Sequence, residues 1–267
     1  MVVTRESVVV DRLRAAGCVF AEDEARLLIE NAAETGAELN ELLAQRVSGT
    51  PLEYLLGWAE FRGLRVRVAP GVFVPRQRTG YLVEVARTLA RRVPSSPIIV
   101  LDLCCGTGAL GLALATQLAA EQREVELTAA DIDPAAVACA RDNLAELGAR
   151  VYEGDLFAAL PADFRNRIDI LMCNTPYVPS DMIARLPAEA RDHEPRAALD
   201  GGRDGLDVLR RVAAQAPAWL APHGHLLVES GQSQADAAVA ILDEHALRGS
   251  VHASEEYFAT VLVGTPR

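Results

Sequence analysis

The sequence predicts an α/β fold in which helices cover both faces of a mostly parallel sheet, with a small helical domain in front of it. Three observations predict this arrangement. Short apolar segments alternate with helical patterns from residue 97 onward, helical spacing alone occupies residues 8–47, and the stretch 49–77 between them changes to a two-residue period. Short buried strands separated by helices are typical of parallel sheets, because each crossover places a helix on a face.

The N-terminal part shows helical periodicity in three short segments. Apolar residues recur at or near positions i, i+3, i+4 and i+7, which predicts amphipathic helices. The expected helices lie at 8–16, 25–32 and 39–47. Helices this short need partners to be stable, so we expect a small bundle rather than a tail.

A hairpin is expected to link the bundle to the sheet. Apolar residues alternate with arginines over 64–68, as in a strand with one wet face. The Ala-Pro-Gly run at 69–71 predicts a turn into a second short strand. Helical spacing resumes over 81–92, and Pro94 and Pro97 end that element.

The remaining elements alternate regularly. Each apolar strand segment is followed by a longer stretch with helical spacing. The expected strands are 97–103, 125–131, 149–155, 167–174, 224–230 and 257–264. The expected helices are 108–120, 134–147, 205–220 and 233–247.

Composition restricts the class of protein. No run approaches the roughly 18 to 20 apolar residues of a membrane span, and the early charges exclude a signal peptide, so we expect a cytoplasmic monomer. All 26 basic residues are arginines against 37 acids, and the net charge of -11 argues against direct nucleic-acid binding. Residues 62–92 are basic although the whole chain is acidic, with eight arginines and one acid. That patch fits either an acidic partner or a solvated face.

Cysteines and histidines give no metal site. The five cysteines are odd in number, lie among apolar residues and lack metal-ligand spacing, so we expect reduced, buried thiols. His223 and His225 share one face of an expected strand and enter it from a Pro-Gly turn, which favours a structural role.

Three successive strand ends carry residues suited to a nucleoside. Gly106 and Gly108 form a turn between a buried strand and a helix, where backbone can approach a ligand. Asp131 ends the next strand, where a carboxylate can accept both ribose hydroxyls. Asp133 precedes Pro134 and is better suited to cap the helix. Asp155 ends the third strand, where it can meet an adenine amino group.

The fourth strand ends in Asn-Thr-Pro-Tyr at 174–177. An Asn-capped turn explains these residues as well as a catalytic site does when they are considered alone. The three upstream strand ends favour catalysis, because they place a ligand at the same edge of the sheet.

The motifs together resemble a known class of enzyme. D-x-x-x-G-x-G, a strand-end acid and N-x-P-Y are similar to class I S-adenosylmethionine-dependent methyltransferases that modify amino groups. The stretches 49–84 and 194–212 are similar to the release-factor glutamine N-methyltransferases. That family has a Rossmann-like fold with a seven-stranded, mostly parallel sheet. The resemblance implies a helical domain at 1–57 that holds the protein partner, a hairpin linker at 58–77 and a methyltransferase domain at 78–267.

The resemblance also implies the cofactor and its contacts. S-adenosylmethionine would be bound at the glycine turn and the strand ends, and S-adenosylhomocysteine would leave. The residues implied are Asp102, Cys104, Gly106, Thr107, Gly108, Asp131, Ile132, Asp155, Leu156 and Asn174.

For the acceptor, the resemblance implies the glutamine of a Gly-Gly-Gln loop in a peptide-chain release factor. The Asn174 side chain and the Thr175 carbonyl would accept the two amide protons, Pro176 would make the turn rigid, and Tyr177 would stack on the amide. Glu194 and Pro195 are expected to join the substrate wall, because long loops in α/β enzymes often do so.

Several residues depart from the family pattern. Thr175 stands where proline is usual, Cys104-Cys105 replace Gly and a small hydroxyl residue, and Leu156 replaces an aromatic residue. Gly80 replaces the glutamate of P-R-x-x-T-E. These departures indicate a divergent paralogue, so methylation of a small-molecule or nucleobase nitrogen and a non-catalytic cofactor-binding protein stay open as alternatives.

Overall fold

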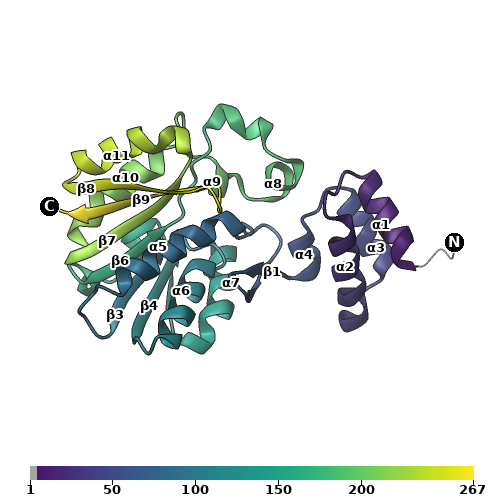
Figure 1. The fold of residues 1–267 in the computed structure, drawn as a ribbon, viewed down its shortest axis with the longest axis horizontal. Coiled ribbons are helices and arrows are strands. Elements are labelled where there is room, and N and C mark those ends of the chain that lie inside the picture. The colour runs from purple at the N-terminus through teal and green to yellow at the C-terminus, as the bar shows by residue number, and fades with distance from the viewer. Residues whose placement is uncertain (1–4) are drawn as a thin grey trace.

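A computed structural model describes residues 5–267 and shows a helical bundle beside a larger sheet domain (Figure 1). The first four residues of the predicted 1–57 domain lie outside the described part. The bundle contains α1 (Arg5–Ala15), α2 (Ala21–Thr35), α3 (Leu39–Val47) and α4 (Leu52–Leu56). Its own core includes Leu13, Leu28 and Leu43, so the three predicted helices pack together as expected.

The hairpin is present but uses a different turn from the predicted one. It consists of β1 (Trp58–Phe61) and β2 (Leu64–Arg67), which pair in antiparallel register. Arg62 and Gly63 both have positive φ, as a two-residue hairpin turn requires. The prediction of a second strand after 69–71 is wrong, because the Val74 amide donates to the Glu194 side chain instead of a strand partner.

The larger domain contains a seven-stranded sheet in the order β5-β4-β3-β6-β7-β9-β8. Pairs among the first five strands of this order are parallel, and β9 runs antiparallel to both of its neighbours. The strands are β3 (Ile98–Leu103), β4 (Val125–Asp131), β5 (Arg150–Glu153), β6 (Ile168–Cys173), β7 (Leu220–Ser230), β8 (Leu247–Ser254) and β9 (Ala259–Pro266).

Helices cover both faces of the sheet and separate two cores. The helices are α5 (Gly80–Ala90), α6 (Ala109–Ala120), α7 (Pro134–Leu144), α8 (Ala188–His193), α9 (Arg196–Leu199), α10 (Asp207–Gln215) and α11 (Ala235–Glu244). One core joins α5, α6 and α7 to the sheet, and the other joins α10 and α11 to the opposite face. Alternate residues of β6 enter each core, with Met172 in the first and Leu171 in the second.

Short 3₁₀ turns complete the chain. They are η1 (Gln77–Thr79), η2 (Ala145–Leu147), η3 (Leu156–Ala159), η4 (Ala162–Phe164), η5 (Ser180–Arg185), η6 (Ala216–Ala218) and η7 (Gln232–Gln234). The predicted helix over 205–220 is therefore shorter, since α10 gives way to η6 around Pro217. The sequence did not predict β8, which the structure shows at Leu247–Ser254. In the described part of the chain, no helix is long and apolar enough to cross a membrane.

Candidate functional site

A pocket of about 510 Å³ opens where β3, β4, β5 and β6 end. Its floor comes from the residues that directly follow these four strands, as expected for an open α/β sheet. Two further segments form its walls: 73–79, which joins the hairpin to α5, and 186–199, which contains α8 and α9. The volume lies within the usual range for a small-molecule site.

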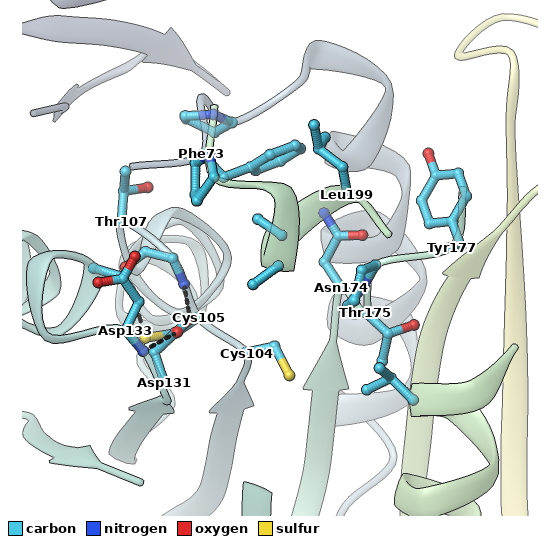
Figure 2. Close-up of a pocket in the computed structure, with 18 of the residues that line it drawn as sticks. Phe73, Cys104, Cys105, Thr107, Asp131, Asp133, Asn174, Thr175, Tyr177 and Leu199 are labelled. Atoms are coloured by element: carbon cyan, nitrogen blue, oxygen red, sulfur yellow. Dashed lines mark hydrogen bonds between the residues drawn. The ribbon is translucent and has the colours of Figure 1, made fainter. Parts of the chain in front are cut away.

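The glycine turn and the strand-end acid are joined directly. Asp131 Oδ2 accepts a hydrogen bond from the Gly106 amide at 2.8 Å, and its Oδ1 accepts from the Asp133 amide at 3.0 Å (Figure 2). Burial raises the pKa of Asp131, while these two amide bonds oppose the increase. Asp133 caps α7 by accepting from the Ala135 amide at 2.8 Å, which confirms its predicted role.

The turn itself needs unusual backbone geometry. Cys104 has φ +56° and Gly106 has φ +54°, both in the left-handed region that favours glycine. Leu156, the first residue of η3 after β5, also has a positive φ of 50°. Non-glycine residues in this region are uncommon and gather at functional sites. Cys104 and Leu156, which both depart from the family pattern, therefore lie at strained positions that line the pocket.

The strand ends fit a nucleoside cofactor. A carboxylate has about four acceptor positions, so Asp131 keeps capacity for two hydroxyls beside its two amide bonds. Ile132 is 60% exposed at the pocket and offers an apolar face to a planar base. Asp155 Oδ2 is bonded to Arg211 at 2.5 Å, and its other carboxylate oxygen can still accept from an amino group.

Two of the predicted cofactor residues lie behind the pocket lining. Asp102 is fully buried and accepts from the Gly111 amide at 2.8 Å, which ties β3 to α6. Gly108 lies where a Cβ would come within 3.0 Å of Leu144, so glycine allows α6 and α7 to pack closely. Neither residue is among those that line the pocket. Both support the turn that carries Gly106 and Thr107.

Asn174 brings an unused acceptor to the pocket. Its Oδ1 atom is buried, and no residue in the described part of the chain donates a hydrogen bond to it. A buried amide oxygen without a partner costs about 1 to 3 kcal/mol, so such atoms in native structures call for an explanation. Figure 2 shows the Asn174 amide beside Leu199 at the end of its strand. The orphan oxygen is explained if a ligand donates to it.

Tyr177, the last residue of the Asn-Thr-Pro-Tyr motif, is fixed by hydrogen bonds at its hydroxyl. Its hydroxyl donates to Glu229 Oε1 at 2.8 Å and accepts from Arg78 Nη2 at 2.8 Å. Burial raises the pKa of Tyr177, and the charge of Glu229 raises it further. Thr175 is buried and Pro176 lines the pocket, so all four residues 174–177 surround one space.

Of the two residues predicted to join the substrate wall, Pro195 lines the pocket and Glu194 does not. The buried Glu194 carboxylate is instead used internally. It accepts from the Val74 amide at 3.1 Å and from Arg76 at 2.5 Å. Glu194 thus fastens one wall of the pocket to the other.

Other lining residues were not predicted from the sequence. Phe73, Arg78 and Leu199 line the pocket from the two wall segments, and Arg211 lines it from α10. The similarity of residues 49–84 to the release-factor glutamine N-methyltransferases could have identified Phe73 and Arg78 as lining residues. No local pattern identifies Arg211, because its contact with Asp155 joins residues far apart in the chain.

Metal ligation has no support in the geometry. Among residues 5–267, no three His, Cys, Asp or Glu side chains are placed to hold a metal ion. His225 Nδ1 instead lies 3.1 Å from Thr265 Oγ1, between neighbouring parts of the sheet. The five cysteines are all free, and three of them are buried.

The fold and this pocket define the protein as an S-adenosylmethionine-dependent methyltransferase of class I, with S-adenosylmethionine as its cofactor. The comparisons agree: the Methyltransferase small domain model matches residues 63–191. A solved methyltransferase from Pyrococcus furiosus has the same fold, with a TM-score of 0.53 at 12% identity, covering 91% of this chain and 97% of that one.

Curated relatives specify the family. A release factor glutamine methyltransferase from Bordetella pertussis is 40% identical over 224 residues, which cover 82% of this chain and 78% of the relative. One from Geobacter sulfurreducens is 42% identical over 197 residues, which cover 73% of this chain and 66% of that relative. The chain belongs to the release factor glutamine methyltransferase family.

Proposed function

We propose that this protein methylates the side-chain amide nitrogen of the glutamine in a release factor's Gly-Gly-Gln loop. The observation that carries this proposal is the buried, unpartnered Oδ1 of Asn174 at the pocket. An amide NH₂ group is a donor that can satisfy such an acceptor, and the names of the curated relatives supply the class of substrate.

Asn174 and Thr175 would prepare the nitrogen for attack. The lone pair of an amide nitrogen is delocalised, so it must become pyramidal before it forms a bond. Acceptors directed at both amide protons favour that change, and the Asn174 oxygen and the Thr175 carbonyl oxygen are the two available. Threonine in place of the usual proline keeps this carbonyl, and the buried position of Thr175 replaces some of the lost rigidity.

S-adenosylmethionine, when bound, supplies an electrophilic methyl group on a positively charged sulfonium. Asp131 and Ile132 would hold its ribose and adenine, as their places at the strand end allow. Asp155 and Leu156 would complete the base contacts. Tyr177 presents an aromatic ring beside the position where positive charge develops on the nitrogen, and such a ring stabilises cations.

The helical bundle and hairpin would hold the protein partner. α8, which lines the pocket, is bonded to the bundle through Arg46 and Glu189. A release factor that contacts the bundle would therefore have its loop close to the pocket wall. The arginines of 62–92 contribute less to partner binding than their number suggests, because six of the eight form internal ion pairs: Arg62, Arg67, Arg76, Arg78, Arg87 and Arg91.

The proposal is tested by incubating the protein with radiolabelled S-adenosylmethionine and a purified release factor. Label should appear on the release factor and should be absent when its Gly-Gly-Gln glutamine is replaced by asparagine, which is one methylene shorter. Asn174→Ala should lower kcat by about 10²–10³-fold, the usual cost of removing one preorganised hydrogen-bonding group. Label on oligonucleotides or small amines in place of the release factor would reject the proposal.

A further inference from the structure

Three side chains from distant parts of the chain meet behind the pocket wall. Arg78 comes from η1, Tyr177 from the segment after β6, and Glu229 from β7. Arg78 Nε donates to Glu229 Oε1 at 3.1 Å, and Tyr177 donates to that same oxygen at 2.8 Å. Arg78 Nη2 closes the triangle by donating to the Tyr177 hydroxyl at 2.8 Å.

Glu229 is buried in an apolar part of the sheet. Its side chain is 3% exposed, it is paired in register with Val261 of β9, and it does not line the pocket. Its second oxygen, Oε2, is buried and accepts no hydrogen bond from the described residues. A carboxylate is costly in such a place unless it is paired, and here both of its partners line the pocket.

Tyr177 is fixed at its backbone as well as at its ring. Gln234 Nε2 donates to the Tyr177 carbonyl at 3.0 Å and to the Asp204 carbonyl at 2.8 Å. The hydroxyl is then fixed by Glu229 and Arg78. With both ends held, the ring cannot swing about the Cα–Cβ bond without breaking charge-assisted hydrogen bonds, which are the stronger kind.

We infer that Glu229 and Arg78 are positioning residues for methyl transfer, and that both act through the hydroxyl of Tyr177. This inference rests on the proposed function. Glu229 fixes the position of the ring beside the acceptor nitrogen, and a misplacement of about 1 Å there can cost about 10²-fold in rate. Its negative charge also makes the phenol more electron-rich, which strengthens the attraction of the ring for positive charge. Arg78 compensates the buried carboxylate from the pocket side.

A double-mutant cycle tests the inference with full-length protein and release factor. Glu229→Gln keeps the size of the side chain and an acceptor but removes the charge, and Tyr177→Phe removes only the hydroxyl. Each single change should lower kcat about tenfold with little change in KM for S-adenosylmethionine. The double variant should be no slower than the slower single variant, because both changes disrupt the same hydrogen bond between Tyr177 and Glu229.

Asp169→Asn is the matched control. Asp169 is a buried carboxylate on the neighbouring strand β6, where it accepts from the Ile99 amide at 2.9 Å at the opposite end of the sheet from the pocket. Its replacement should lower stability but leave kcat near the wild-type value. If Glu229→Gln slows the enzyme by the same factor in the Tyr177→Phe background as in the wild type, Glu229 does not act through Tyr177, and the inference is overturned.

A second readout needs no turnover. With ¹³C-labelled tyrosine, NMR records the Cζ chemical shift of Tyr177, which reports the hydrogen bonds of its hydroxyl to Glu229 and Arg78. Glu229→Gln should move that chemical shift, and an unchanged shift would overturn the inference. If the wild-type protein leaves release factors unlabelled, the proposed function fails, while this chemical shift still decides whether Glu229 controls the hydroxyl.

Discussion

Asp102 shows how a single residue at the base of the glycine turn affects the whole fold. Its carboxyl group is fully buried, one oxygen accepts from the Gly111 amide, and the other has no donor among residues 5–267. Burial raises the pKa of Asp102 to about 8, the Gly111 bond opposes the shift, and the charge of Asp131 adds to it. In the unfolded chain the same group ionises near its ordinary value of 3.8.

The free energy of unfolding should therefore fall as pH rises from about 4 to 8. The folded-state pKa is raised, so the contribution of this group is complete below the unfolded value and is lost as pH approaches the folded value. Asp102→Asn cannot ionise and should lose less stability than the wild type between pH 5 and 8, by at most about 4 kcal/mol. Urea denaturation at several pH values measures this, and parallel curves for the two proteins would contradict it.

Among the elements, the loop containing α8 and α9 depends on one buried carboxylate. Glu194 follows α8 and accepts from the Val74 amide and from Arg76, which belong to the segment between hairpin and α5. Phe73 and Pro75 of that segment line the pocket opposite Pro195. The two walls are thus joined at a position that is itself outside the pocket lining.

Glu194→Ala should free the segment around Val74. The buried amide loses its acceptor, which costs about 1–3 kcal/mol, and Arg76 loses its partner. Trypsin should then cut after Arg76 or Arg78 faster than in the wild type, with time-resolved mass spectrometry as the measurement. Glu194→Gln, which can still accept from the amide, is the control and should be cut at an intermediate rate. Equal cleavage of all three proteins would show that Glu194 does not hold the wall.

The elements differ in how far their residues predict them. The buried strands β3, β4 and β6 are apolar over most of their length, so their pattern identified them. β8 contains Arg248, Gly249, Ser250 and His252, and Val251 is 44% exposed. Its strand structure comes from pairing with β9 along its whole length, which no local pattern reveals.

The candidate site divides in the same way. Asp131 and Asn174 are the last residues of predicted strands, and parallel strands end at one edge of the sheet, so their place in one pocket was predictable. Arg78 and Glu229 are 151 residues apart in the chain. Their contact brings η1 against the end of β7, and only the folded structure shows it.

At the scale of the whole molecule, a buried arginine joins the helical bundle to the sheet domain. Arg46 of α3 is 7% exposed in its side chain and bonds Glu24 of α2 at 2.6 Å. The same guanidinium reaches Glu189 of α8 at 2.7 Å, and Glu189 lines the pocket. In Figure 1, α8 lies on the side of the sheet domain that faces the bundle. Arg46 thus links the bundle to the pocket wall, and the Tyr54 hydroxyl of α4 adds a longer bond to the His193 carbonyl of α8 at 3.5 Å.

This link predicts that a change at Glu189 affects KM for a whole release factor but not KM for a short peptide. Glu189→Ala removes the Arg46–Glu189 ion pair but leaves the Arg46–Glu24 pair, so stability should fall by less than about 1 kcal/mol, because the Glu189 side chain is 46% exposed. If the bundle orients the partner, KM for the whole release factor should rise several-fold, while KM for a short Gly-Gly-Gln peptide should stay unchanged. Both constants come from steady-state methylation assays.

Asp192→Ala is the matched control on the same helix, because Asp192 pairs only with its neighbour Arg191 among the ion pairs of the described chain. It should change neither constant. A rise in KM for the peptide equal to that for the release factor would mean that Glu189 acts within the pocket itself. The bundle would then contribute to folding but not to the placement of the substrate, since loss of its ion pair with α8 would leave the discrimination between loop and whole protein intact.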